Sequence, residues 1–487
     1  MKKTLSILLI FSLFLLGSCT STTSTTFLSS TTTLTTSSET TTSTTVAVIS
    51  PDSIGTNSLT SSSLVLPDWI DDAVMYEVNV RQYTAEGTFA AFQEALPRLQ
   101  ELGVEVLWFM PIHEISWTHR IGTLGSYYAI TDYYSINPEF GTLEDFHNLV
   151  SEAKSMGFKI VMDIVFDHTG WDSPWITEHP EYYIQVNGDI VIPRGTNWQD
   201  VAELDTSRQD VITELGNVLT YWASEFGIDG FRCDFASGVE TSTWEKLRDQ
   251  VEAINPEIFF LAEDDSIYSW FDTFNANYGG WSLLTNLQNV YHGTATKWTL
   301  INYLKQANAK YPEGAFSLNF ITNHDINSWD GTIESRLGSS ADVMTMLTFT
   351  LPGMPLIYSG QESSLEHPLA FFDKDLITWN GYDLQPFLEG FVNLKKTHEA
   401  LYNTNFSNST DFLYNANSKL LSFVRFDVTS GDQVLVLANL SSTTVTTSVH
   451  FDTYSGVWTN NETNEQVAFD PIDSVSVPGY GFVIYTK

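Results

Sequence analysis

The chain has 487 residues, of which 43% are hydrophobic, so it is long enough for a barrel-sized domain and smaller units beside it. Its formal net charge of −37 argues against nucleic acid and other polyanions as partners, because an acidic surface repels them. Only two cysteines are present, which excludes a disulfide framework. We therefore expect a neutral or cationic ligand and no organic cofactor.

Residues 1–19 have the layout of an export signal. Two lysines precede an apolar run from Leu5 to Leu16 that is too short to span a bilayer. The run ends in Leu16-Gly-Ser-Cys19, which is similar to a bacterial lipobox and implies cleavage before Cys19 and acylation of its thiol. The exported protein would then be held at the bacterial membrane by its lipid alone. The alternative is an ordinary N-terminal anchor helix.

Residues 20–66 are dominated by serine and threonine. Such a composition has too few large apolar side chains to bury a core. We interpret these residues as a flexible stalk between the membrane anchor and the folded part.

Apolar strand-like runs alternate with helical patterns over residues 67–403. We expect strands near 74–80, 104–110, 159–166, 228–234, 258–263, 316–321 and 355–358. One further strand, between 263 and 316, is the least legible, and we place it at 281–286. About eight such units favour an α/β fold of the closed (β/α)8 TIM-barrel type over an open sheet.

Two segments interrupt or follow this alternation. Residues 169–204 form a connection too long for an ordinary loop and rich in aromatic residues, so we predict a small inserted subdomain after the third strand. Residues 404–487 change to a period of two with turn signals between the runs. They predict a C-terminal antiparallel β-sandwich domain.

Three acids stand at the ends of three predicted strands: Asp234, Glu263 and Asp325. Any one of them alone would be read as a helix cap or turn former. In a parallel barrel, however, the carboxyl ends of the strands converge, so all three could share one pocket. Arg232 lies two residues before Asp234, on the same face of its strand, and we expect it to keep Asp234 ionised.

Several segments, in this order, resemble motifs of the α-amylase family of glycoside hydrolases (family 13). They are Tyr128-Ala-Ile-Thr-Asp-Tyr, Asp163-Ile-Val-Phe-Asp-His168, Glu203-Leu-Asp205, Gly230-Phe-Arg-Cys-Asp234, Glu263, Asn323-His-Asp325 and the segment from Gly353 to Glu362. The resemblance covers about residues 68–487. It implies a retaining enzyme that acts on α-glucans.

The resemblance also implies roles for single residues. Asp234 would be the nucleophile, Glu263 the general acid/base, and Asp325 the third carboxylate, which binds sugar hydroxyls. The substrate-binding residues would be Tyr128, His168, Arg232, Asn323 and His324. We expect Tyr128 to stack on a sugar and both histidines to donate hydrogen bonds as neutral imidazoles, rather than to serve only the core. Crowding by Asp234 and Asp325 should favour the protonated form of Glu263.

Calcium is a further implication, because some family members bind it near these motifs. The candidate ligands are Asp167 and Glu203, which offer the hard oxygen atoms that calcium prefers. Both positions, and Gly238, depart from the residues that the family commonly has there. Asp167 therefore either binds calcium or caps a loop.

The main interpretation is a monomeric, lipid-anchored, extracytoplasmic α-amylase that cleaves α-1,4 bonds of starch-like glucans or maltooligosaccharides. One alternative is a related maltogenic, cyclodextrin- or pullulan-cleaving hydrolase or an α-glucan transglycosylase, since the motif residues do not distinguish these. A second alternative is a surface glucan-binding lipoprotein without activity. That alternative is weakened because all three acids are present.

Overall fold

The computed structural model describes residues 52–53, 62–265, 271–406 and 409–487. Cys19 and most of the predicted stalk lie outside these ranges, so the signal peptide and the lipid anchor stay predictions. Among the described residues, no helix is both long and apolar enough to cross a membrane.

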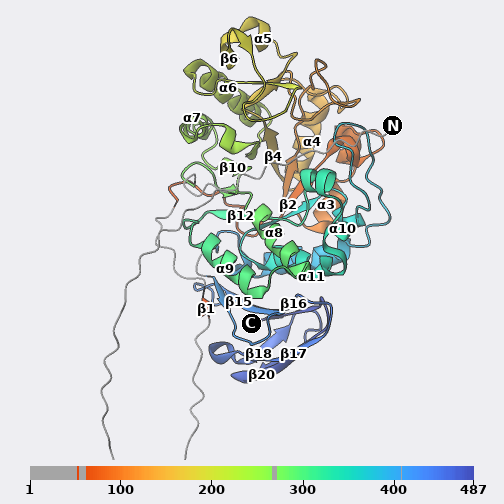
Figure 1. The fold of residues 1–487 in the computed structure, drawn as a ribbon, viewed down its shortest axis with the longest axis vertical. Helices are drawn as coiled ribbons and strands as arrows, with labels where there is room; N and C mark the ends of the chain where they lie inside the picture. The colour runs from red at the N-terminus through yellow and green to blue at the C-terminus, as the bar shows by residue number, and fades with distance from the viewer. Residues whose placement is uncertain (1–51, 54–61, 266–270, 407–408) are drawn as a thin grey trace, which may run out of the picture. The chain divides into compact units, whose positions relative to one another are not determined.

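Eight parallel strands close into a barrel, which confirms the predicted (β/α)8 fold (Figure 1). In chain order they are β2 (Met75–Val78), β3 (Val106–Phe109), β4 (Lys159–Ile164), β9 (Gly230–Cys233), β10 (Phe259–Ala262), β11 (Ala276–Asn277), β12 (Phe316–Asn319) and β13 (Met354–Tyr358). The ring closes where β13 pairs with β2, with Leu356 opposite Met75. All eight carboxyl ends therefore lie at one rim.

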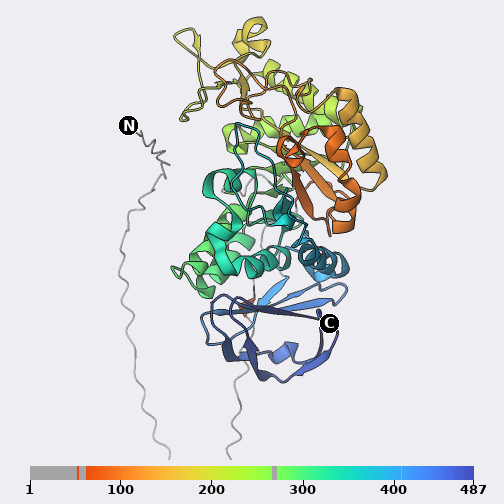
Figure 2. The same ribbon diagram turned by 90° about the vertical axis from the view of Figure 1, so that its right-hand side faces the viewer.

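Helices follow most of these strands and cover the barrel from outside (Figure 2). They are α1 (Val80–Tyr83), α2 (Phe89–Gln93), α3 (Leu96–Leu102), α4 (Leu143–Ser155), α6 (Gln209–Glu225), α7 (Thr241–Glu252), α8 (Gly280–Tyr291), α9 (Lys297–Asn308), α10 (Ile333–Leu337), α11 (Ala341–Thr350) and α12 (Gln385–Thr397). Within the described residues, none lies between β10 and β11.

The longest of these helices, α6, shows how the barrel and its outer layer pack. Val211, Leu215, Leu219 and Trp222 recur at helical spacing and are fully buried. Burying each such side chain contributes about 1.5–3 kcal/mol. Trp222 also donates its indole N–H to the carbonyl of Tyr133 at 2.8 Å, so its one polar group is satisfied inside the core.

The predicted strand at 281–286 is wrong. These residues lie in α8, and the strand is the two-residue β11, Ala276–Asn277. Leu283, Leu284 and Leu287 are buried and follow a helical spacing, so this run packs as a helix against the barrel.

The connection after β4 contains its own short elements. They are β5 (His168–Gly170), α5 (Trp175–Glu178), β6 (Gln185–Val186), β7 (Asp189–Ile190) and β8 (Val201–Glu203). The strands β5 and β8 pair antiparallel, with His168 opposite Glu203. This pairing returns the chain to the rim from which it departed.

The C-terminal part is antiparallel, as predicted. A seven-stranded sheet has the order β1-β14-β15-β16-β21-β18-β19, and β17 pairs separately with β20. The strands are β14 (Thr410–Phe412), β15 (Leu420–Phe426), β16 (Gln433–Asn439), β17 (Val445–His450), β18 (Gly456–Asn460), β19 (Gln466–Phe469), β20 (Ile472–Val477) and β21 (Phe482–Thr486). A separate apolar cluster around Trp458 and Phe451 forms the core of this part.

The predicted stalk extends too far toward residue 66. Asp52 and Ser53 form β1, which pairs antiparallel with β14. Ser62 donates its backbone N–H to Glu313 and its hydroxyl to the carbonyl of Phe271. Part of the predicted stalk is therefore tied to the folded protein by hydrogen bonds, and Leu66 packs against the main apolar core.

A buried lysine joins the barrel helices to the C-terminal sheet. Lys297, the first residue of α9, is 1% exposed and donates to the backbone oxygen (3.0 Å) and the side-chain oxygen (2.7 Å) of Asn415. Burial lowers the pKa of Lys297 from 10.5 to about 7. Folding therefore competes with protonation at this site.

Lys297 should make stability rise with pH. Between its folded and unfolded pKa values the unfolded chain binds more protons than the folded protein, so stability increases by about 2 kcal/mol from about pH 7 to about pH 9. Lys297→Met should remove this increase, which urea denaturation at both pH values measures. The same replacement of the exposed Lys246 controls for the loss of one charge. Identical pH dependence in wild type and Lys297→Met would contradict the prediction.

Candidate active site

Acidic side chains collect at the carboxyl ends of the barrel strands. Asp234 directly follows β9, Glu263 directly follows β10, and Asp325 lies in the loop after β12. Because the strands are parallel and the barrel is closed, these ends meet at the same rim.

The guanidinium of Arg232, which is fully buried in β9, links these acids. Its Nη1 donates to Asp163 Oδ1 at 2.8 Å and to Asp234 Oδ1 at 2.6 Å. Its Nη2 lies 2.9 Å from Glu263 Oε1, although it is not aligned for a hydrogen bond. Its Nε donates to the hydroxyl of Tyr278 at 3.1 Å. Asp234 and Glu263 are thus held side by side by one cation.

The second oxygen of Glu263 is held by the backbone. The N–H of Phe235 donates to Glu263 Oε2 at 2.6 Å. Phe235 has a φ of 38°, in the left-handed region that is costly for a side chain of this size. Such strain is typical of functional sites, and here it directs an N–H toward the carboxylate.

Arg232 lowers the pKa of Asp234, but less than the prediction that it keeps Asp234 ionised requires. Burial raises the pKa of Asp234 well above its ordinary value, and the charge of Glu263 raises it further, while Arg232 only partly opposes them. Burial likewise raises the pKa of Asp163 to about 7. The cluster therefore retains protons at a pH where isolated carboxyl groups have lost them.

His324 contacts Asp325 and two further groups. Its Nε2 lies 3.3 Å from Asp325 Oδ2 and 2.8 Å from the hydroxyl of Tyr128, and its Nδ1 lies 2.5 Å from Glu77 Oε1. Burial opposes protonation of His324, but Asp325 and Glu77 raise its pKa well above 6.5. The two carboxylates thus favour the imidazolium form of His324, whereas the sequence predicts a neutral imidazole.

His324 in turn acts on Asp325. Burial alone would raise the pKa of Asp325, but His324 lowers it below its ordinary value. The indole N–H of Trp329 also donates to Asp325 Oδ1 at 3.2 Å. The carboxylate of Asp325 is therefore ionised and held from two sides.

An aromatic surface runs beside Asp325. The ring of Tyr128 lies nearly parallel to that of Phe371, with centroids 6.1 Å apart, and Phe371 lies 5.5 Å from Trp329. Tyr128 is half-buried, whereas Trp329 is 55% exposed. These rings could support the apolar C–H faces of a sugar.

Two predicted substrate ligands are occupied by protein partners. Both ring nitrogens of His168 face acceptors, Asp167 Oδ2 at 2.8 Å and the carbonyl of Tyr128 at 3.1 Å. Asn323 is buried and uses Oδ1 to accept the N–H of Ile326, while its Nδ2 has no partner among the described residues. The sugar contacts of His168 and Asn323 therefore stay predictions, and one donor of Asn323 is unused.

The family comparison agrees with this geometry. The description "Alpha amylase, catalytic domain" matches residues 50–380, more than half of the chain. The chain belongs to the α-amylase family. The Asp234, Glu263 and Asp325 positions lie within the matched region.

Known members of the family resemble this chain at low identity. The α-amylase MalA of Haloarcula japonica is 26% identical over 350 residues, which are 69% of this chain and 50% of that protein. A cyclomaltodextrinase from Bacillus sp is 24% identical over 77% of this chain and 73% of its own length. A maltosyltransferase of Rhodospirillum rubrum is 34% identical, over 42% of this chain and 33% of its own length. The chain spans 50% to 65% of the length of several curated relatives.

Among solved structures, an α-amylase from Lactobacillus plantarum superposes with a TM-score of 0.76. It is 28% identical and covers 85% of this chain and 99% of its own. A maltogenic α-amylase from Thermotoga neapolitana has the same TM-score at 23% identity, over 85% of this chain and 98% of its own, and so supports the fold alone.

The predicted calcium ligands of this α-amylase family member do not fit a metal site as they lie. The Glu203 carboxylate accepts the backbone N–H of Arg194 at 3.0 Å and the Nε of the same arginine at 2.9 Å. Asp167 pairs with His168, leaving one oxygen buried without a partner. The described part of the chain contains no group of three or more His, Cys, Asp or Glu suited to a metal ion. We therefore derive no step through calcium.

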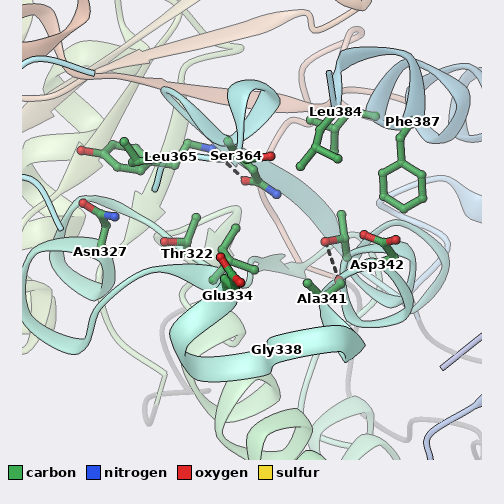
Figure 3. A pocket seen from close by; sticks show the side chains of 15 residues that line it. Thr322, Asn327, Glu334, Gly338, Ala341, Asp342, Ser364, Leu365, Leu384 and Phe387 are labelled. Atoms are coloured by element: carbon green, nitrogen blue, oxygen red, sulfur yellow. Dashed lines mark hydrogen bonds between the residues drawn. The ribbon is translucent and has the colours of Figure 1, made fainter. Parts of the chain in front are cut away.

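Figure 3 shows the residues that line a cavity, whose volume is about 240 Å³. It is bounded by the loop after β12, by α10, α11 and α12, and by the turn after β13. Its walls are mostly apolar, including Leu365, Leu384 and Phe387, and Glu334 and Asp342 are exposed. None of the three predicted catalytic acids lines it.

Sequence reasoning missed two residues of this site, Glu77 and Trp329. Glu77 had a signal, since it is a charge inside an apolar strand-like run. Trp329 had none, because its contact with Asp325 depends on a π-helical turn at Ile326–Asp330. Such turns are frequent at functional sites.

Treatment with a calcium chelator should not change the thermal stability of this protein. Arg194 already provides the positive charge at Glu203, so a chelator should not lower the thermal unfolding temperature. Differential scanning calorimetry before and after treatment with EDTA measures this. A fall of several degrees that added calcium reverses would contradict the prediction and restore Asp167 and Glu203 as ligands.

Proposed function

We propose that this protein is a retaining glycoside hydrolase that cleaves α-1,4-glucosidic bonds of starch-like α-glucans. The observation that carries the proposal is the pairing of Asp234 and Glu263 on one buried guanidinium at the rim of the barrel. Hydrolysis with retention needs two neighbouring carboxyl groups, one ionised and one protonated. Burial and the charge of Glu263 raise the pKa of Asp234, so the pair retains a proton. The reaction needs that proton on Glu263 and not on Asp234.

In the proposed reaction, Asp234 attacks the anomeric carbon while Glu263 gives its proton to the leaving glycosidic oxygen. The bond to that oxygen breaks, and a covalent glycosyl ester forms on Asp234. Glu263, now a carboxylate, takes a proton from water, whose oxygen attacks the same carbon and releases Asp234. Two inversions give net retention.

Binding of the sugar would involve both polar and aromatic groups. Asp325, ionised and held by His324 and Trp329, would accept hydrogen bonds from sugar hydroxyls. Tyr128 and Trp329 would support the C–H faces of glucose units. A neutral glucan also suits a chain with a formal charge of −37.

A second candidate is a relative on the same scaffold, namely a maltogenic, cyclodextrin- or pullulan-cleaving hydrolase or a transglycosylase. This candidate is supported by the similarity to a maltosyltransferase, which is 34% identical to this chain over 227 residues. Both candidates use the same covalent ester on Asp234. They differ in whether water or a sugar hydroxyl attacks that ester.

We further propose that the protein acts outside the cytoplasm as a monomer, anchored by a lipid on Cys19. The proposed export and lipid anchoring rest on the sequence of residues 1–19 alone. A tethered enzyme would act on large glucans close to the cell surface.

Asp234→Asn should abolish hydrolysis of amylose, because an amide cannot form the ester. We expect kcat to fall by about a thousandfold or more, measured as reducing ends released by the full-length protein. Asp229→Asn is the matched control, since Asp229 lies at the opposite end of the same strand and pairs with Lys154. Near wild-type activity in Asp234→Asn would refute the assignment.

Early products should carry the α configuration. Proton NMR of the first products from amylose reports the anomer before it equilibrates in water. Mid-length α-anomers support endo-acting hydrolysis, and longer glucans formed without new reducing ends support the transglycosylase. Products that appear first as β-anomers would contradict the double displacement.

A further inference from the structure

The first barrel strand, β2, carries a buried glutamate that contacts a histidine of the active site. Glu77 lies in β2 and is 0% exposed. A carboxylate in such a position is costly to desolvate unless it is paired. Burial accordingly raises the pKa of Glu77, and His324 opposes this. A purely structural strand would place an apolar side chain here, as Met75 does two residues earlier on the same face.

The partner of Glu77 is His324, reached across the barrel. Glu77 Oε1 accepts the Nδ1–H of His324 at 2.5 Å and lies 3.4 Å from its backbone N–H. The other ring nitrogen points to Asp325 and to the hydroxyl of Tyr128. The imidazole is thus fixed between two carboxylates, one in the core and one at the rim.

We propose that Glu77 is a positioning residue of the reaction: its carboxylate fixes the orientation of His324 and keeps it charged, so that the imidazolium holds Asp325 ionised toward the sugar. This inference rests on the proposed function. Glu77 does not touch the substrate and acts only through His324.

The other charges around His324 do not replace Glu77. Asp325 comes from the same loop, Tyr128 from the loop after β3, Asp163 from β4 and Arg232 from β9. Tyr128 is neutral, since burial raises its pKa well above 10, and Asp163 is engaged by Arg232. Besides Asp325, the carboxyl group within hydrogen-bond reach of His324 is that of Glu77.

Glu77→Gln tests the role, because it keeps the shape and the acceptor oxygen but removes the charge. His324 should then lose its proton as the pH rises, and activity should fall with it. We expect kcat on amylose within about threefold of wild type near pH 6 but at least about tenfold lower near pH 8, with KM nearly unchanged. Glu77→Asp, which keeps the charge, should retain the wild-type shape of the pH profile.

Glu362→Gln is the matched control. Glu362 is also fully buried and pairs with Arg98 and with the hydroxyl of Tyr76. Its replacement should lower the thermal unfolding temperature without adding a fall in kcat at alkaline pH. If the dependence of kcat on pH has the same shape in Glu77→Gln as in wild type, Glu77 serves only the core and the proposal fails.

A second measurement separates this inference from the proposed function. Titration of the histidine rings by ¹⁵N NMR, with His324 assigned by its loss in His324→Gln, needs no substrate. The midpoint of His324 should move at least about one pH unit lower in Glu77→Gln, a tenfold change in its protonation equilibrium. An unchanged midpoint overturns the inference, whereas a wild-type protein inactive on every glucan overturns the function alone.

Discussion

The active site depends on one buried cation shared among several acids. Arg232 is fully buried, and a charge in that position is stable only with complete pairing. The planar guanidinium presents several N–H groups in fixed directions, so it can hold Asp163, Asp234 and Glu263 together, which the single ammonium of a lysine could not do. The positions of the two reacting carboxyl groups therefore follow from the position of one side chain in β9.

Much of the fold could be predicted, because most barrel strands are apolar runs separated by helical patterns. The exception shows where this reasoning ends. The strand β11 has only two residues, too few for any periodicity, and it is held by its neighbours β10 and β12. The more apolar run that follows, residues 281–286, has the composition of a strand but forms part of α8. Likewise, β1 forms by backbone pairing with β14, which Ser/Thr-rich sequence does not reveal.

The residues of the active site could likewise be predicted only in part. Asp234, Glu263 and Asp325 could be placed together from sequence, since parallel strands end at one rim. Their partners could not, because these contacts join distant positions: Glu77 and His324 are 247 residues apart. The charge of His324 likewise depends on the carboxyl groups buried beside it, and the pairing of Glu203 with the exposed Arg194 depends on how the inserted segment folds. Sequence motifs thus identify the reacting groups, and the closed barrel determines their protonation.

The covalent ester on Asp234 is the most direct test of this account. In Glu263→Gln the water that releases the ester lacks its base, while α-maltosyl fluoride needs no acid to lose its leaving group. Mass spectrometry of the variant treated with this fluoride should find one maltosyl group, and peptide mapping should place it on Asp234. A maltosyl group on another residue, or fluoride release without any labelled protein, would contradict the account.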